Sequence, residues 1–317
     1  MAGSEVPDRP DPTAPTVGDA RPSDPDAAGA RGSTFRSGFV SFVGRPNVGK
    51  STLVNAIIGT KVSIVSDKVQ TTRTQIRGIL NRPDAQVIFV DTPGMMRPRT
   101  LLGERTNNAA TSSIGDVDLV CVVLDATMPL GKGDRFVAAR APKSAFLIVN
   151  KLDAASRDEV LAMLRTSGDF EFAEYFPVSA ATGEGVDVLT EAIIGRMPHG
   201  PAFYPTDVVA DMSETFWVAE LVREQLLHHT SEELPHSIAC RVTDWEEREG
   251  KGPYVRVEVI VERDSQKPIV IGKNGSVVKA VGTAVRAQLP EGAYLDLFVR
   301  VDRDWQRRPK ALDRLGY

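Results

Sequence analysis

The segment 44–51, GRPNVGKS, constrains the fold of this chain more than any other feature. It follows the apolar run 39–43 and precedes 52–59, TLVNAIIG, so the pattern predicts a strand, a phosphate-binding loop and a helix. The glycines allow successive N–H groups to point at phosphate oxygens, and the helix adds its positive N-terminal end. The alternative is a glycine-rich turn that opens an ordinary helix. On the phosphate interpretation, the nucleotide contacts come from Gly44, Arg45, Pro46, Asn47, Val48, Gly49, Lys50, Ser51 and Thr52.

The segment 87–94, VIFVDTPG, predicts the metal end of the same site. Lys50 would reach the β- and γ-phosphates, and the Ser51 hydroxyl would bind Mg²⁺. Asp91 ends an apolar strand, where its carboxylate would hold Mg²⁺ through water. Gly94 would donate its backbone N–H to the γ-phosphate and free the next segment to move.

The run 145–153, AFLIVNKLD, distinguishes guanine from adenine. A carboxylate only accepts hydrogen bonds, and guanine offers two donors where adenine presents an acceptor at N1, so Asp153 selects guanine. Asn150 would bind the base edge or tie loops together. The aliphatic stem of Lys151 would lie on the face of the ring.

A third strand end, in 176–185 (FPVSAATGEG), completes the nucleotide pattern. Ser179 and Ala180 follow a short strand, and the N–H of Ala180 would donate to guanine O6. Each short motif is weak alone, because a strand-end Asp is more often a helix cap or turn residue. All four motifs occur in order, each at the end of a strand, and together they indicate GTP.

The segment 66–80, SDKVQTTRTQIRGIL, contains a candidate switch. A threonine about twenty residues after Lys50 would bind the metal only while the γ-phosphate is present, so hydrolysis would release the segment. Thr71 and Thr72 are both candidates, and the sequence does not choose between them. The two threonines would also suit the start of a strand at 74–80.

Hydrolysis is expected to be slow, because Met95 follows Gly94 where a glutamine would orient the attacking water. Asn47 is a candidate contributor, since its carbonyl would help to bind K⁺ near the phosphates and add positive charge in the transition state. The candidate catalytic residues are therefore Asn47, Lys50, Thr72 and Gly94.

Composition indicates a globular protein of two domains. The chain has 317 residues, of which 42% are hydrophobic and 25% charged, with a net charge of −4, so any nucleic-acid contact must come from a local patch. Cys121 and Cys240 lie in apolar stretches and are expected to be reduced core residues, which suits the cytosol. We expect no secretory signal and no apolar run of the ~18 residues that a membrane span needs.

Four segments are expected along the chain. Residues 1–36 are rich in Pro, Asp, Ala and Gly and are predicted to be disordered. Residues 37–200 alternate apolar strands with helices, which predicts an α/β P-loop GTPase domain: a mostly parallel sheet with helices on both faces. The proline-rich stretch 201–210 is predicted to be a linker, and 211–317 a second domain.

The second domain is predicted to follow the order α-β-β-α-GxxG-α-β. Its helices are expected at 213–230, 267–271 and 276–289, and its strands at 237–245, 254–263 and 294–301. The sequence 272–275, GKNG, joins two helices, which is the arrangement in which such a loop clamps a single-stranded nucleic acid backbone.

The charge around this loop favours RNA over a simple helical corner. From 265 to 290 there is no Asp or Glu, and the basic residues are Lys267, Lys273, Lys279 and Arg286. The alternative is a solvated basic helix face. The candidate RNA-binding residues are Lys267, Ile271, Gly272, Lys273, Asn274, Gly275 and Lys279.

With these motifs, the chain resembles the Era family of bacterial GTPases over about residues 36 to 317. The first domain carries GRPNVGKSTL, QTTR, DTPG, NKLD and PVSA. The second carries ELPHS (233–237), ERDSQKPIVIGKNG (262–275) and DWQRRPK (304–310). The resemblance implies that the second domain is a type II KH domain. A relative with two GTPase domains is excluded because each motif occurs once, and the N-terminal extension departs from the family pattern.

The resemblance implies a function in assembly of the small (30S) ribosomal subunit. Era-like proteins bind near the 3′ end of 16S ribosomal RNA, and their GTP state governs that binding. They are cytoplasmic, with some peripheral association at the inner membrane, and we expect a monomer that uses GTP or GDP, Mg²⁺ and K⁺. Two other functions remain open: an RNA-binding module that GTP only stabilises, and a membrane-associated signalling GTPase.

Overall fold

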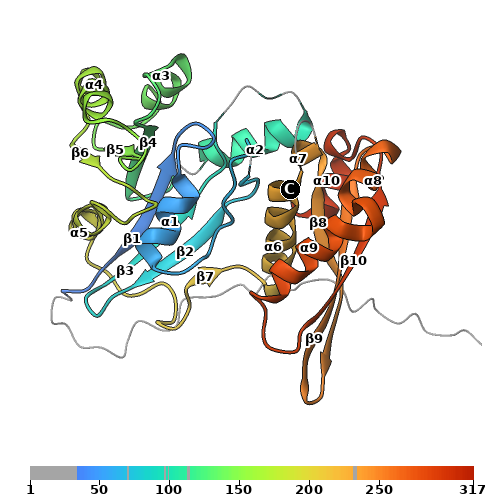
Figure 1. Cartoon of the computed structure of the whole chain (residues 1–317). Helices are drawn as coiled ribbons and strands as arrows, with labels where there is room; N and C mark the ends of the chain where they lie inside the picture. Colours follow the sequence, from blue (N-terminus) through green and yellow to red (C-terminus); the bar gives the residue numbers. More distant parts are fainter. Residues whose placement is uncertain (1–33, 70, 96–97, 99, 113–114, 231–233) are drawn as a thin grey trace, which may run out of the picture. The chain divides into compact units, whose positions relative to one another are not determined.

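Seven strands of the first part of the chain form one sheet in the computed structural model (Figure 1). Five are parallel, while β2 runs antiparallel to β3 and β7 antiparallel to β2. The mostly parallel sheet confirms the predicted fold class. The spatial order is β6 (Glu174–Pro177), β5 (Phe146–Asn150), β4 (Leu119–Asp125), β1 (Arg36–Val43), β3 (Ala85–Asp91), β2 (Ile76–Asn81) and β7 (Ala210–Asp211).

Helices cover both faces of this sheet, because its central strands are apolar on both sides. Residues of α1 and α5 share one buried cluster with the sheet, and residues of α2, α3 and α4 share another. The helices are α1 (Lys50–Ile58), α2 (Leu101–Ser112), α3 (Lys132–Ala138), α4 (Arg157–Ser167) and α5 (Val186–Arg196).

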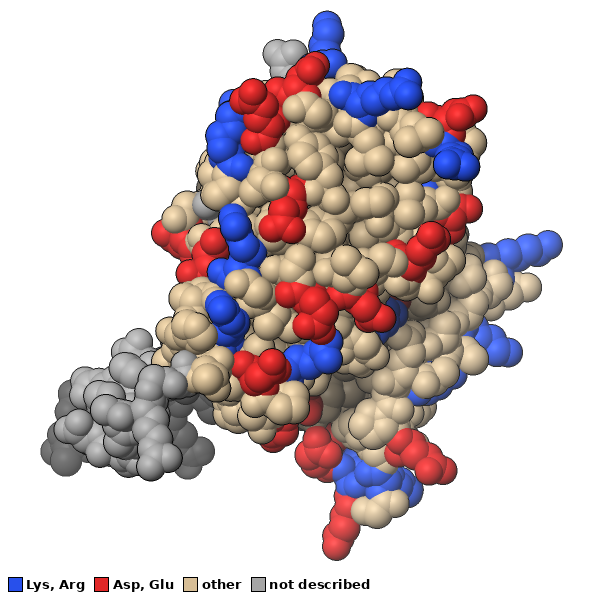
Figure 2. All heavy atoms as spheres, turned by 90° about the vertical axis from the view of Figure 1, so that its left-hand side faces the viewer, with Lys and Arg blue, Asp and Glu red and all other residues tan. Residues whose placement is uncertain are grey.

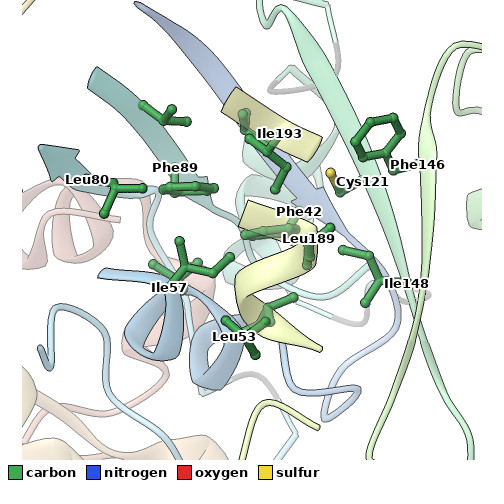
Figure 3. Close-up of a cluster of buried hydrophobic side chains, with 14 of the residues drawn as sticks. Phe42, Leu53, Ile57, Leu80, Phe89, Cys121, Phe146, Ile148, Leu189 and Ile193 are labelled. Carbon is green, nitrogen blue, oxygen red and sulfur yellow. The ribbon is translucent and has the colours of Figure 1, made fainter. Parts of the chain in front are cut away.

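The core beneath α1 and α5 fixes the strands that carry the site. Phe42 and Phe89, on neighbouring strands β1 and β3, stack with ring centroids 5.6 Å apart (Figure 3). Leu53 of α1 and Leu189 of α5 are fully buried in the same cluster, which also contains Cys121. Burial of large side chains on both helices therefore holds the ends of β1 and β3 in fixed positions.

The structure describes residues 34–317 except 70, 96–97, 99, 113–114 and 231–233. Thr34–Tyr317 form one compact unit. Of the segment predicted to be disordered, residues 1–33 lie outside the described part, and Arg36 already begins β1. In the described residues, no helix combines the length and the apolar character needed to cross a bilayer.

The stretch expected to be a linker, 201–210, lies along the edge of the sheet. Gln86 donates to the carbonyl of Tyr204 at 2.8 Å and accepts from the N–H of Phe203 at 2.7 Å. Ala210 and Asp211 then pair with β2 as the seventh strand. The prolines limit hydrogen bonding of this stretch but do not prevent its pairing at a sheet edge, where a strand needs partners on one side only.

The rest of the chain forms a three-stranded sheet in the order β10-β9-β8, covered by helices (Figure 1). The predicted element order is confirmed, with β10 parallel to β9 and β8 antiparallel to it. Two short helices, α7 and α10, were not predicted. The elements are α6 (Glu214–His229), α7 (Leu234–Ser237), β8 (Ala239–Arg248), β9 (Lys251–Val261), α8 (Lys267–Ile271), α9 (Ser276–Arg286), β10 (Tyr294–Val301) and α10 (Pro309–Leu315).

Surface charges are mixed where Figure 2 displays them. The face in view, the left-hand side of Figure 1, carries Lys and Arg interspersed with Asp and Glu. This agrees with the net charge of −4 for the whole chain. Alternating signs largely cancel beyond about 8–10 Å at physiological salt, so this face creates no extended field that would attract an RNA.

Candidate functional site

The phosphate loop has a backbone that requires glycine at two positions. Gly49, the N-cap of α1, has a φ of 95°, and a Cβ there would lie 2.2 Å from Nδ2 of Asn150. A Cβ on Gly44 would lie 2.7 Å from the carbonyl oxygen of Val123. The loop therefore packs directly against the ends of β4 and β5, with its N–H groups at the start of α1.

A cleft of about 400 Å³ opens over this loop. The sequence-predicted residues that line it are Pro46, Asn47, Gly49, Lys50, Ser51, Thr52, Thr71, Thr72, Gly94 and Lys151. The segment before the two threonines, residues 64–67, also lines it. Asp153, Ser179 and Ala180 are not among the lining residues.

Lys50 is held by backbone carbonyl oxygens in the loop. Its Nζ lies 3.0 Å from the oxygen of Arg45 and 3.4 Å from that of Gly44. Burial lowers the pKa of Lys50 to about 8, although the Asp91 charge acts to raise it. The negative charge of bound phosphate oxygens would stabilise the protonated form of this buried side chain.

Three hydroxyl groups converge on Asp91 at the end of β3. Its Oδ2 accepts from Ser63 at 2.6 Å and from Ser51 at 2.7 Å, and Thr72 Oγ1 lies 3.5 Å away. Asp91 is fully buried, and burial raises the pKa of its carboxyl group despite these hydrogen bonds. Oδ1 of Asp91 has no hydrogen-bond partner among the described residues. An orphaned carboxylate oxygen near the hydroxyls of Ser51 and Thr72 is a set of oxygen ligands that fits Mg²⁺.

The two candidate switch threonines point in different directions. Thr72 Oγ1 lies 3.0 Å from Ser51 Oγ, inside the group around Asp91. Thr71 instead donates its hydroxyl to the carbonyl of Lys68 at 2.7 Å. The strand expected from 74 begins at Ile76, so both threonines lie in the preceding loop.

The motifs predicted to contact the base are linked by Asn150. Its Nδ2 donates to the carbonyl of Val48 at 2.9 Å, and its Oδ1 accepts from the N–H of Ala180 at 3.0 Å. The predicted donor for guanine O6 is thus bonded to Asn150 here. Ser179 donates to Oδ1 of exposed Asp153 at 2.5 Å, which orients the carboxylate. Asn150 ties the phosphate loop to the base-contacting loop, one of its two predicted roles.

Lys151 adopts a left-handed backbone conformation with φ of 71°. Its Nζ lies 2.6 Å from Oδ2 of Asp125, the last residue of β4. Burial acts to raise the pKa of Asp125, but hydrogen bonds from Lys151 and Thr127 together outweigh burial and lower the pKa below its ordinary value. Analysis of the sequence did not identify Asp125, although it ends an apolar strand as Asp91 does.

Gly94 lies against the phosphate loop. A Cβ at this position would come within 2.5 Å of the Pro46 nitrogen. Met95 donates its N–H to the carbonyl of Gly44 at 3.2 Å, and its side chain is buried in the core. Asn47 has a φ of 64° and donates through Nδ2 to the carbonyl of Asp67 at 2.6 Å, so the loop and the switch segment are in contact.

The GKNG loop of the second part joins α8 to α9 with a left-handed backbone. Gly272, Asn274 and Gly275 have φ values of 77°, 53° and 76°. A Cβ on Gly272 would lie 2.7 Å from the backbone nitrogen of Val277. The loop therefore approaches the first turn of α9, and Lys273 within the loop is exposed.

Two exposed apolar side chains, one on α8 and one on β10, were not identified from the sequence. Ile269 of α8 is 57% exposed and Phe298 of β10 is 54% exposed. Lys267 Nζ lies 5.9 Å from the centroid of the Phe298 ring. Alternation along 294–301 contains the signal, since Phe298 falls on the face opposite buried Leu295 and Val299.

Comparison with known proteins now places the chain in a family. A family model described as 50S ribosome-binding GTPase matches residues 39–151, and a KH domain model matches residues 233–306. The GTPase Era of Mycobacterium sp. (strain KMS) is 48% identical over 298 residues, which cover 90% of this chain and 100% of that protein. The chain belongs to the Era family of GTPases.

Other Era proteins agree with this assignment. The GTPase Era of Nocardioides sp. (strain ATCC BAA-499 / JS614) is 46% identical over 301 residues, covering 89% of this chain and 96% of that protein. Solved Era structures match over 89% of this chain and 99% of theirs, with 34% identity and a TM-score of 0.85. One is a single-residue variant of Aquifex aeolicus Era bound to GDP·AlF4⁻, and another is Era with MgGDPNP and nucleotides 1506–1542 of 16S ribosomal RNA. Membership in this family makes the chain a GTPase with a C-terminal KH domain.

Proposed function

We propose that this GTPase is a switch that binds the 3′-end region of 16S ribosomal RNA and assists assembly of the small ribosomal subunit. One observation carries the proposal: the same chain combines a switch threonine at the metal end of the nucleotide cleft with a basic GxxG loop. The Era structure with nucleotides 1506–1542 of 16S ribosomal RNA supports the choice of RNA. The family model named for the 50S subunit covers the GTPase part alone.

Ser51, Thr72 and Asp91 are the proposed metal-binding residues. Ser51 and Thr72 would bind Mg²⁺ directly, and Asp91 would hold it through water. The metal would neutralise charge on the β- and γ-phosphates. Lys50 and the N–H groups from Gly44 to Thr52 would bind the phosphates, with Gly94 contacting the γ-phosphate. Thr71 is not proposed as a ligand because its hydroxyl is bonded to Lys68.

Guanine recognition is assigned to Asp153, supported by Asn150, Lys151, Ser179 and Ala180. Asp153 would accept from guanine N1–H and the exocyclic amine while Ser179 holds its other side. For this contact Ala180 would exchange its bond with Asn150 for one with guanine O6, or share its N–H between them. These roles rest on the arrangement of the loops at the ends of β5 and β6.

Hydrolysis is proposed to be slow because the thioether of Met95 cannot orient the attacking water by hydrogen bonding. Asn47 Oδ1 would help to bind K⁺ near the phosphates, since the Nδ2 of the same amide is already bonded to Asp67. The catalytic set remains Asn47, Lys50, Thr72 and Gly94. Equal hydrolysis rates in K⁺ and Na⁺ that Asn47→Ala leaves unchanged would remove Asn47 from this set.

RNA binding is assigned to the surface around the GKNG loop. The loop and the start of α9 would contact the phosphate backbone. Exposed Ile269 and Phe298 would pack against bases, because each presents an apolar surface beside the basic residues. The full proposed set comprises Ile269 and Phe298 with Lys267, Ile271, Gly272, Lys273, Asn274, Gly275 and Lys279.

We further propose a monomer that acts in the cytoplasm and makes at most peripheral contact with the inner membrane. Both cysteines are free and buried, which suits a reducing compartment. Burial raises the pKa of the Cys240 thiol to about 12, so neither oxidation nor metal binding is favoured there.

RNA binding measured in two nucleotide states tests the proposal. An oligonucleotide from the 3′ end of 16S ribosomal RNA would be titrated into protein loaded with GDP or a non-hydrolysable GTP analogue. We expect tighter binding in the GTP state, and Lys273→Glu should weaken binding and reduce its salt dependence. Lys132→Glu on α3 makes the same charge change at an exposed site of the GTPase part, and should have little effect.

Two outcomes would replace this proposal. Equal RNA affinity in both states would favour an RNA-binding module that nucleotide only stabilises. Cosedimentation with lipid vesicles but not with small subunits would favour a membrane-associated signalling GTPase.

A further inference from the structure

Helix α6 carries three buried charged side chains within two turns. Glu220, Arg223 and Glu224 are 5%, 0% and 4% exposed. Burial of a charge is costly unless it is paired. Arg223 donates through Nε and Nη2 to the two carboxylate oxygens of Glu220, at 2.7 and 2.5 Å. This fork fixes the orientation of the guanidinium group.

The same guanidinium contacts the switch segment of the GTPase part. Arg223 Nη2 also donates to the carbonyl oxygen of Thr71 at 2.5 Å. The next residue of α6, Glu224, accepts from the N–H of Val65 at 2.9 Å and from Lys61 Nζ at 2.5 Å. Helix α6 therefore contacts the residues just before the switch segment, and the segment itself beside its threonine pair.

The bond to Thr71 acts on Thr72 through a rigid peptide group. The carbonyl of Thr71 and the nitrogen of Thr72 belong to one planar unit, so fixing the carbonyl limits how Thr72 can turn. Thr72 Oγ1 lies 3.0 Å from Ser51 Oγ at the metal end of the cleft. Without the bond from Arg223, the loop would lose a charge-assisted contact that favours this position.

We infer that Arg223, oriented by Glu220, is a positioning residue that holds the Thr72 hydroxyl at the metal site. Helix α6 then favours the GTP-bound over the GDP-bound state. The inference rests on the proposed function, in which Thr72 binds Mg²⁺ only with GTP. It assigns to the C-terminal part a role in the nucleotide site itself.

Helix α6 also packs against an element of the proposed RNA-binding surface. Leu221, Val222 and Leu226 are buried in one cluster with Val281 and Val285 of α9, the helix that follows the GKNG loop. One helix thus contacts the switch segment and the helix of the proposed RNA loop. If α6 favours the GTP state, the coupling free energy is reciprocal, and RNA binding should depend on the same contacts.

Variants of the ion pair test the inference. Arg223→Met alone would leave the charge of Glu220 buried and unpaired, so the double variant Glu220→Leu/Arg223→Met is the main test. Replacement of a buried ion pair by apolar side chains is often neutral for stability. Arg223→Lys keeps one charge-assisted donor and should give an intermediate result. Arg241→Met is the control: it removes a partly exposed partner of Glu258 on β8, and Glu258 keeps its second partner, Arg300.

Affinities for GDP and for a non-hydrolysable GTP analogue would be measured for the full chain at several Mg²⁺ concentrations. We expect the double variant to bind the analogue at least about tenfold more weakly, with unchanged GDP affinity and a higher Mg²⁺ requirement. Arg241→Met should behave as the parent protein does. Equal weakening of both nucleotides, or no change in either, would overturn the inference.

Thr72→Ala separates failure of the inference from failure of the proposed function. If Thr72→Ala weakens only the GTP analogue and the α6 variants do not, the metal role of Thr72 stands and the role of Arg223 is rejected. If Thr72→Ala lacks this selective effect, the metal role assigned to Thr72 is itself rejected, and the inference falls with it.

Discussion

At the scale of single residues, the phosphate loop depends on a glycine backbone and on one asparagine that contacts it. Gly49 can adopt its φ of 95° without strain, and the space that a Cβ would fill is taken by the Asn150 amide. That amide then bonds to the phosphate loop and to Ala180. Asn150 therefore connects the phosphate loop to the loop that contains Ala180.

Asp153→Asn should exchange guanine specificity for xanthine specificity. Guanine presents two donors, whereas xanthine has a carbonyl at C2 that accepts from the asparagine amide. We expect GTP affinity to fall by about 1.5–3 kcal/mol and XTP affinity to rise, measured by competition against a fluorescent nucleotide. Asp158→Asn removes an exposed carboxylate on α4 and should change neither affinity. Unchanged GTP binding by Asp153→Asn would show that another group reads the base.

At the scale of elements, charge pairing across the small sheet supports the proposed RNA-binding part. Glu258 on the central strand β9 lies 2.7 Å from Arg241 of β8 and 3.2 Å from Arg300 of β10. Burial acts to raise the pKa of Glu258, but hydrogen bonds and charges from both arginines lower it below its ordinary value of 4.5. The ionised carboxylate thus links all three strands.

Glu258→Gln should destabilise the protein in a pH-dependent manner. Because the folded-state pKa is lowered, the contribution of Glu258 is complete above the ordinary pKa and is lost as the pH falls through the folded value. We expect a loss of about 1.5–3 kcal/mol at pH 7 that shrinks toward pH 3, measured by urea unfolding. Glu291→Gln, at an exposed loop position, is the control. A destabilisation that stays constant with pH would exclude this ionic contribution.

At the scale of the whole described chain, side chains from the GTPase part complete the core of the C-terminal part. Arg73, which follows Thr72, donates to the carbonyls of Ile238 and His236 at 2.6 and 3.2 Å and lies 5.7 Å from the Trp305 ring centroid. Leu102 of α2, the helix after DTPG, shares a buried cluster with Trp305. The residue after Thr72 and the helix after DTPG therefore both pack against the C-terminal part.

Arg73→Met should reduce the cooperativity of unfolding between the two parts. The change removes charge-assisted hydrogen bonds to backbone carbonyls, with an expected loss of about 1.5–3 kcal/mol. Calorimetry should show a single transition in the parent protein that broadens or divides in the variant. Arg82→Met removes only an exposed ion pair with Glu191 and should shift stability by less than about 1 kcal/mol. An unaltered transition in Arg73→Met would mean that the two parts unfold independently of this contact.

The accuracy of the sequence predictions followed how local each interaction is. Strand β10 and helix α8 begin and end as predicted, because alternation and turn residues are local properties. Strand β7 was not predicted, since a two-residue strand has no periodicity and exists only through its pairing with β2. The role of Ser63 could not have been found either, because a single serine in a loop carries no pattern.

The sequence by itself determined the GTPase class, the order of elements and the basic GxxG loop. Each of these depends on residues that lie close together in the sequence, so the pattern can be recognised without the fold. The sequence left open which threonine lies beside Ser51 and Asp91, and it gave no indication that Arg223 contacts Thr71. Only the tertiary structure decided these points. They depend on where a helix from one end of the chain packs against a loop from the other, and such long-range packing is set by the complete fold.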